Sequence, residues 1–338
     1  YMKMENLRAR GPAQQAAELA AQLGDKAREG HALRLLGYDA RTRMDLQRSR
    51  TMLEKSAQRF REGGQMNEAA ATLHTLSLTL SDLSEYGAAL AAVQEAVALS
   101  RQAGDKRQEA TSLRRVAIVY LEQSQFEAAL PYAEAALALH RAVGDRVEES
   151  HALNVIGLAH AWLGDAVKAE AYLRDALSVA ETATSALAAM MAAENLAFFH
   201  YSWRGDYAGA LDFLEEMLAK PCLATNEYAL NKLRLRRADF LARLGQYDQA
   251  MTIVQTVRAQ MDAAIAQGVM DSATELEVLT FLGWLKAVLG DRQTSLMYLE
   301  QASAGVDRAG AEFIAANVLG LFAHALLLLG EPDDIRRA

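Results

Sequence analysis

The sequence repeats itself every 40 residues, and this period constrains the fold more than any other feature. The pair Gly-Asp occurs at residues 24–25, 104–105 and 144–145, and each pair opens a similar run of residues. A second anchor lies in the middle of each copy: an aromatic or apolar residue with Ala or Ser three positions later, such as Tyr86 and Ala89. A fixed period of about 20–50 residues is typical of repeat architectures. We therefore expect a stacked array rather than separate globular domains.

Each copy has the pattern of two antiparallel helices joined by a short turn. Leu33, Leu36 and Ala40 recur at helical spacing, so they share one helix face. Gly37 lies beside this face, and small residues at the equivalent positions let a second helix approach closely. That second helix ends at Gly-Asp, because Gly adopts the left-handed conformation that closes a helix and Asp caps the next one. One pair cannot bury its apolar stripe alone, so neighbouring pairs must stack.

Composition supports an all-α fold. Four prolines in 338 residues favour long helices with few loops, and few segments alternate as β-strands do. Cys222 is the single cysteine, which excludes an internal disulfide and a cysteine-rich zinc site. The most apolar stretch, residues 318–329, is shorter than the ~20 residues that cross a bilayer. The first residues carry no secretory signal. We therefore expect a cytoplasmic protein with no membrane partner.

The unit resembles the tetratricopeptide repeat. Residues 153–169 and 238–250 carry the best copies of its pattern, in which Leu-Gly is followed by Asp or by Gln-Tyr and then by Ala. The 40-residue period with Gly-Asp between units resembles the longer-helix variety of kinesin light chains and of the sensor region of the bacterial maltose-regulon activator. The resemblance covers nearly the whole chain. It implies an α-solenoid, a right-handed superhelix of antiparallel helix pairs whose first helices line a concave groove.

The register predicts seven near-complete helix pairs with a half unit at each end. The fifth copy carries one extra residue, which the spacing places around residues 202–204. The sixth is irregular, because Arg234 and Arg237 stand where leucine is expected and Pro221 delays its first helix. Neither end has a polar capping helix, so we expect a segment of a longer protein, with fused domains at either end. The expected parts are 1–23, a second helix alone with the N-terminal cap region; 24–216, regular units one to five; 217–275, irregular unit six with an insertion; and 276–338, unit seven and a partial unit eight.

No pattern of catalytic or metal-binding residues accompanies the repeats. The seven histidines form no His-Glu-x-x-His motif and no cluster with zinc spacing. No glycine-rich phosphate loop is present either. His160 and His200 fall on the packing face and are interpreted as core histidines. We therefore predict a protein that is not an enzyme and uses neither a cofactor nor a metal.

A second face of the first helices is expected to line the groove. Three residues before the small residue, successive units carry Arg34, His74, Arg114 and Asn154. These side chains donate hydrogen bonds, so they can hold backbone carbonyls or acidic side chains of a bound peptide. The predicted groove residues are His31, Arg34, Tyr38, Arg41, His74, Arg114, His151 and Asn154.

Charge points to the same kind of partner. The net charge of −8 argues against nucleic-acid binding, whereas residues 1–60 carry 12 Lys/Arg and 7 Asp/Glu and would attract an acidic segment. We therefore interpret the chain as a non-enzymatic scaffold that binds a protein or peptide segment in its groove. The alternative is a sensor or regulatory region of a larger bacterial signalling or transcription-regulating protein. Such a region would bind a small effector or restrain neighbouring domains.

Overall fold

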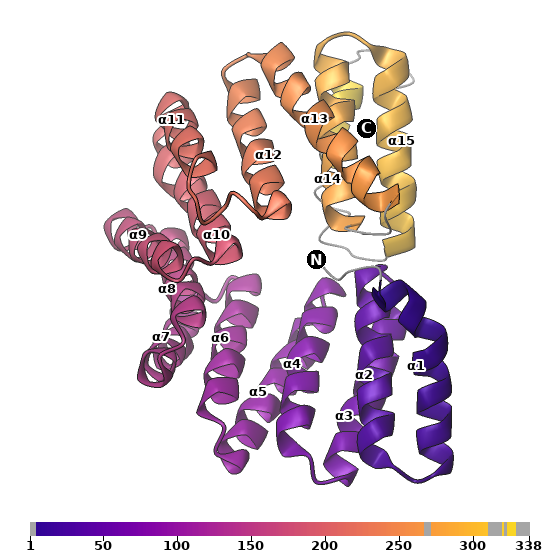
Figure 1. Cartoon of the computed structure of the whole chain (residues 1–338). Coiled ribbons are helices and arrows are strands. Elements are labelled where there is room, and N and C mark those ends of the chain that lie inside the picture. The colour runs from indigo at the N-terminus through magenta and orange to yellow at the C-terminus, as the bar shows by residue number, and fades with distance from the viewer. Residues whose placement is uncertain (1–4, 267–271, 310–319, 321–322, 329–338) are drawn as a thin grey trace.

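The protein is a tandem array of helices, shown by a computed structural model that describes residues 5–266, 272–309, 320 and 323–328 (Figure 1). Within these ranges no β-strand occurs, which confirms the predicted all-α class. The predicted partial unit eight lies largely outside the described residues. The α-helices are α1 (Glu5–Gln22), α2 (Lys26–Thr42), α3 (Leu46–Glu62), α4 (Met66–Asp82), α5 (Tyr86–Ala103), α6 (Lys106–Glu122), α7 (Phe126–Val143), α8 (Arg146–Trp162), α9 (Ala166–Thr182), α10 (Ala186–Leu196), α11 (Tyr207–Leu218), α12 (Glu227–Arg243), α13 (Tyr247–Ala266), α14 (Ser272–Val288) and α15 (Arg292–Ala309).

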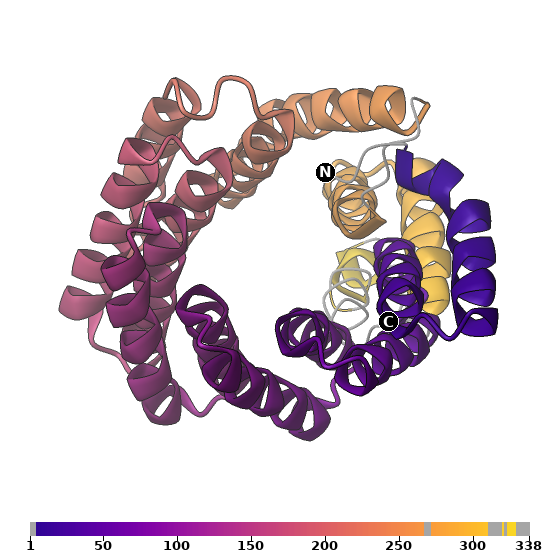
Figure 2. The same ribbon diagram turned by 60° about the horizontal axis from the view of Figure 1, so that its bottom comes forward.

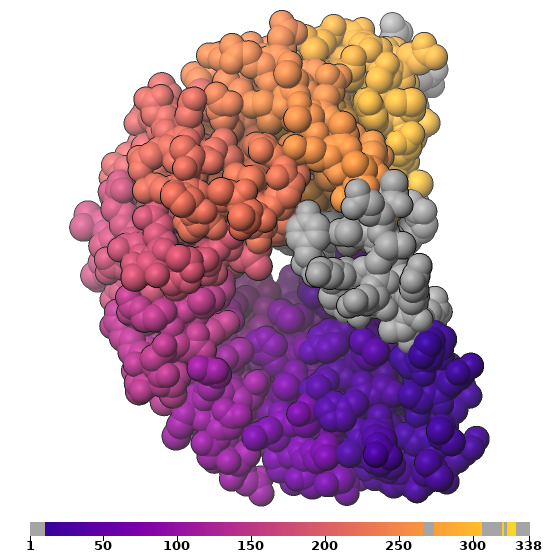
Figure 3. Space-filling view, viewed as in Figure 1, coloured from indigo at the N-terminus to yellow at the C-terminus, as the bar shows by residue number. Residues whose placement is uncertain are grey.

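Neighbouring helices stack into a right-handed superhelix, as predicted. Helix α2 packs on α3, α4 on α5, α6 on α7 and α8 on α9, and each pair packs on the next. The first helices of successive pairs also touch, as α4 with α6 and α8 with α10 do. Because helices lie closest together on the inside of a curve, these first helices form the inner layer. The array curves around a common centre (Figure 2), and its two arms end on the same side of the molecule (Figure 3).

The Gly-Asp pairs end one unit and begin the next, as the sequence predicts. Gly104 and Gly144 have φ values of 72° and 71°, in the left-handed region that suits glycine. Asp105 then caps α6, because its carboxylate accepts a hydrogen bond from the backbone N–H of Gln108 at 2.9 Å. These turns set where each first helix begins and therefore which side chains it presents to the inner face.

The small residue of each unit lies where its two helices cross. A Cβ placed on Gly157 would lie 2.8 Å from Cγ of Leu173, a residue buried on α9. Gly37 faces Leu53 in the same way, with 2.7 Å between the added Cβ and Cγ of the leucine. The close helix approach inferred from the sequence is therefore confirmed at these crossings.

The extra residue of unit five is absorbed in a wider helical turn. The first helix continues beyond α10 as a π-helix, η1 (Ala197–Tyr201), followed by a 3₁₀ turn, η2 (Ser202–Arg204). A π-helix bonds each N–H one residue further back than an α-helix does, so it accommodates one inserted residue. The sequence places the insertion around 202–204, whereas the structure widens the turn directly before it. Helix α11 then packs on η1.

The unexpected arginines of unit six are ion-paired at the side of α12. Arg234 Nη1 donates to Glu227 Oε1 at 2.6 Å, and Arg237 lies 3.6 Å from Glu215. The leucines next to Arg234, Leu233 and Leu235, are buried instead. The helix nevertheless keeps the register of the repeat, because Ala238 and Leu241 are buried as their counterparts Gly37 and Ala40 are.

Candidate functional site

The inner face of the first helices carries the predicted donor column, but its arginines are bound within the protein. Arg34 Nη1 donates to Glu68 Oε2 at 2.6 Å, and Arg114 Nη2 donates to Glu148 Oε2 at 2.8 Å. In both cases the acid lies 34 residues later, on the first helix of the next unit. These arginines therefore hold adjacent units together, and their charge is largely neutralised before any ligand arrives.

The remaining predicted residues of unit one make similar contacts. Arg41 Nη2 donates to Asp82 Oδ2 at 2.7 Å, while burial raises the pKa of Asp82 against the opposing effect of Arg41. Tyr38 shares a hydrogen bond of 3.0 Å with the hydroxyl of Thr75. His31 Nδ1 lies 3.2 Å from Arg34 Nη2. Arg41 and Tyr38 thus connect α2 to α4, whereas His31 contacts a residue of its own helix.

His74 lies at the centre of the column. Its Nδ1 is buried and has no hydrogen-bond partner among the described residues. Burial, together with Arg114, Arg115 and Arg41, lowers the pKa of His74 to about 3. The imidazole is therefore neutral at pH 7 and does not supply the positive charge that an acidic ligand would seek.

Unit four ends the column with two less accessible residues. Asn154 is buried, and its Oδ1 accepts a hydrogen bond from Asn195 Nδ2 at 3.0 Å. Burial, aided by Arg114, lowers the pKa of His151 and favours its neutral form. Of the four predicted column residues, none presents an unpaired charge to the inner face.

Sequence reasoning missed a buried polar network beside the column. Arg115 on α6 is buried and donates to the Ser77 hydroxyl at 3.1 Å, to the Ser77 carbonyl at 3.2 Å and to Glu122 at 3.0 Å. It also contacts the hydroxyl of Ser81, which in turn donates to Glu122 at 2.6 Å. The network fixes α6 against α4 and so positions His74 and Arg114.

Apolar side chains on the same face accompany the donor column. Ile118, Leu158 and Phe198 follow the small residue in three successive units and are half-buried. On α10, Leu187 and Met191 are 44% and 38% exposed. Met191 has the register position of His31 and His151. Aliphatic side chains of this size at inner-face positions give the groove an apolar character around units three to five.

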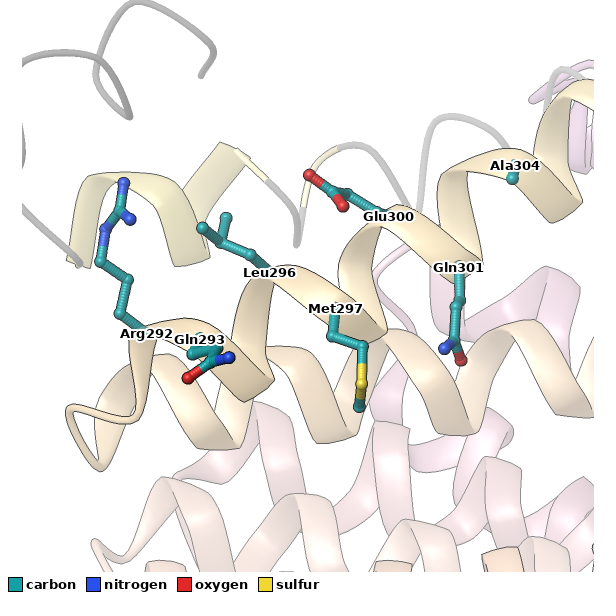
Figure 4. Close-up of a pocket in the computed structure, with 7 residues that line it drawn as sticks. All are labelled: Arg292, Gln293, Leu296, Met297, Glu300, Gln301 and Ala304. Carbon is teal, nitrogen blue, oxygen red and sulfur yellow. The ribbon is translucent and has the colours of Figure 1, made fainter.

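A hollow of about 730 Å³ lies along α15, away from this face (Figure 4). It follows one face of the helix over successive turns. Its lining contains one arginine and one glutamate, and these two residues do not make up a catalytic site. The lining residues are Arg292, Gln293, Leu296, Met297, Glu300, Gln301 and Ala304.

Two kinds of site are not found in the part of the chain that the structure describes. No three or more His, Cys, Asp or Glu side chains there are grouped to hold a metal ion. None of the helices formed by those residues is both long and apolar enough to span a bilayer.

The buried histidines predict a loss of stability in acid. His140 on α7 is fully buried, neither ring nitrogen has a partner in the described region, and burial lowers its pKa. Since the unfolded chain then binds the proton more tightly, stability is retained above pH 6.5 and falls below it, by up to about 1.4 kcal/mol per pH unit. The substitution His140→Phe tests this. Phenylalanine is chosen because Phe60 holds the equivalent position in unit one. We expect the variant to lose less stability than the wild type between pH 7 and pH 5, because phenylalanine binds no proton when the chain unfolds. Urea unfolding at both pH values measures this, and equal losses would contradict it.

The comparisons with known proteins agree with this architecture. The tetratricopeptide repeat family model matches residues 68–142 and 108–182. A comparison with curated proteins gives no match. A Rap protein, solved in complex with competence and sporulation factor, has a TM-score of 0.59 at 14% identity, over 87% of this chain and 77% of that one.

Two further solved structures share the fold. Aspartyl phosphate phosphatase F from Bacillus subtilis has a TM-score of 0.54 at 14% identity, over 75% of this chain and 68% of that one. A signal transduction ATPase with a tetratricopeptide repeat sensor, from Pyrococcus horikoshii, has a TM-score of 0.54 at 13% identity, over 82% of this chain and 43% of that one. At such identities the likeness shows the fold alone.

Proposed function

Because this chain is built from tetratricopeptide repeats, we propose that it is a non-enzymatic scaffold whose inner face binds an extended polypeptide segment. The observation that carries the proposal is the exposure of Leu187 and Met191 at inner-face positions of α10. Half-buried Leu158 and Phe198 continue this apolar surface on the neighbouring helix turns. An extended peptide can place alternate side chains against such a row while its backbone meets polar groups at the side.

Apolar residues of the partner segment are expected to contribute more to binding than its acidic residues. A carboxylate of the partner would have to displace Glu68 from Arg34 or Glu148 from Arg114, and both ion pairs are short. Burying aliphatic surface needs no such exchange, and each fully buried side chain contributes about 1.5–3 kcal/mol. We therefore propose a partner segment with aliphatic or aromatic residues over units three to five. Its acidic residues, expected from the sequence, contribute less.

Selection of binders from a random peptide library displayed on phage tests the proposal. We expect the enriched peptides to carry spaced apolar residues and to bind the double variant Leu187→Ser, Met191→Ser about tenfold more weakly, a change of about 1.4 kcal/mol. Leu244→Ser is the matched control, because Leu244 is 41% exposed but follows α12 at a turn. Equal binding by the double variant and the control would contradict the proposed groove.

A regulatory region of a larger protein is the second candidate. The shared fold with the repeat sensor of the signal transduction ATPase favours it, since this chain covers 43% of that protein. In this second candidate function, the inner face would bind an effector. Binding would then change the activity of the attached domains through the repeat array. The two candidates can be separated by expressing the full-length gene. The test is whether the selected peptides change the activity of any attached domain.

A further inference from the structure

Two half-exposed tryptophans lie side by side at the edge of units four and five. Trp162 ends α8 and is 50% exposed, and Trp203 in η2 is 47% exposed. Their ring centroids are 5.9 Å apart and their planes meet at 72°. Phe199 packs edge-on against both, at 5.3 Å and 4.8 Å, and Phe126 stacks on Trp162 at 5.9 Å. The indoles are thus held by rings beside them while half of their surface faces solvent.

The repeat itself places the two indoles together. Each tryptophan precedes the second helix of its unit by four residues, counted to Ala166 and to Tyr207. Units one to three carry polar residues at this position, Thr42, Asp82 and Glu122. In unit five the π-helix turns the end of the first helix, so that Phe198 and Phe199 also contact Trp203. Packing within a unit does not require a tryptophan here, and π-turns occur often at functional sites.

An exposed guanidinium, that of Arg204, lies beside the aromatic cluster, which consists of Phe126, Trp162, Phe199 and Trp203. Glu170 accepts a hydrogen bond from Arg174 Nε at 2.8 Å and lies 2.9 Å from His200 Nδ1. Burial lowers the pKa of His200 and favours its neutral form. Arg204 reaches the same carboxylate only at 3.4 Å, and its side chain is 55% exposed. Glu170 is therefore shared by two guanidinium groups, and Arg204, one residue after Trp203, is the more loosely held of the two.

We propose that the aromatic cluster is a second binding surface, for an aromatic side chain next to a carboxylate on a partner polypeptide. The partner's ring packs on the exposed indole faces, and its carboxylate pairs with Arg204. Tryptophan and arginine are the residues that most often dominate binding at protein interfaces, and offset or edge-to-face ring pairs add to the burial of apolar area. A second copy of this chain fits less well, because each copy carries a net charge of −8.

The indole N–H signals of the protein provide the test. The chain has three tryptophans, and Trp284 on α14 donates its indole N–H to His324 at 3.2 Å, so it serves as an internal reference. We expect N-acetyl-L-tryptophan to shift the signals of Trp162 and Trp203 and to leave that of Trp284 in place. N-acetyl-L-tryptophanamide, which lacks the carboxylate, should bind at least threefold more weakly. Arg204→Gln should remove this difference, and Arg243→Gln, which changes an exposed arginine paired with Asp239, should keep it.

Three outcomes would overturn the proposal. If the indole N–H signals of Trp162 and Trp203 do not shift at millimolar concentrations of the probe, the aromatic site is ruled out. Equal affinity for the two probes, or a difference that persists in Arg204→Gln, removes the carboxylate partner. Shifts of both signals on concentrating the protein without probe show instead that a second copy covers the surface. The inner-face variant Leu187→Ser, Met191→Ser should bind the probes as the wild type does, which separates this test from that of the groove.

Discussion

Replacing Arg115 with methionine is expected to destabilise the protein by about 2–3 kcal/mol. The guanidinium is buried between α4 and α6, where it donates to both polar groups of Ser77 and to Glu122. Methionine fills much of the space but donates no hydrogen bond, so the Ser77 carbonyl and hydroxyl lose a charged partner, and such bonds contribute about 1.5–3 kcal/mol. Glu122 turns to solvent more easily than a fully buried acid, which keeps the loss below the ~3–5 kcal/mol of a broken buried pair.

Urea unfolding followed by circular dichroism measures this loss. Arg28→Met is the control, because Arg28 is exposed and pairs with Asp25 only at 3.4 Å. Exposed pairs contribute about 0–1 kcal/mol. If Arg115→Met unfolds at the same urea concentration as Arg28→Met, the network does not hold α4 and α6 together.

Gly157→Val is expected to cost about 1–3 kcal/mol, because the crossing of α8 and α9 has no room for a side chain. The new Cβ alone would lie 2.8 Å from Leu173 Cγ and 3.3 Å from the Leu173 backbone nitrogen. Leu173 is fully buried and cannot move aside without opening a gap in its own cluster. The two helices must therefore separate, and the thermal midpoint should fall by several degrees.

Gly87→Ala is the matched control for this effect. Gly87 also lies inside a helix, α5, but nothing lies within 4 Å of a Cβ added there. Alanine is favoured over glycine in a helix by about 0.5–1 kcal/mol, so this variant should be slightly more stable than the wild type. A loss of similar size at both positions would mean that helix propensity and not the crossing governs the result.

The repeat made most of the fold predictable. One period predicts the helix positions, the Gly-Asp caps and the packing face of Leu33, Leu36 and Ala40. It does so because every unit packs its apolar face against its neighbours in the same way. The place of the wider turn in unit five does not follow from it. An inserted residue fits almost anywhere near a helix end, and the repeat pattern alone does not say which turn takes it.

Binding in the groove stays a prediction, and the ion pairing of its arginines was not foreseen. Arg34 and Arg114 lie on the inner face as expected, yet each meets a glutamate of the next unit. A signal for this was present, since a glutamate stands 34 residues after each of these arginines and after no other member of the column. The depressed pKa of His74 could not be foreseen, because it depends on burial and on arginines from two other helices, α2 and α6.

The pattern of helix contacts also determines how the molecule responds to force. Among the residues that the structure describes, all extensive contacts join helices that are neighbours or next neighbours in chain order. A pull on the two ends therefore loads each interface between units in series, and the weakest one yields first while the others remain folded. Each unit of about 40 residues releases roughly 130–140 Å of extended chain when it opens. Under force the array would therefore lengthen in steps of similar size, one unit at a time, instead of unfolding all at once at a single force.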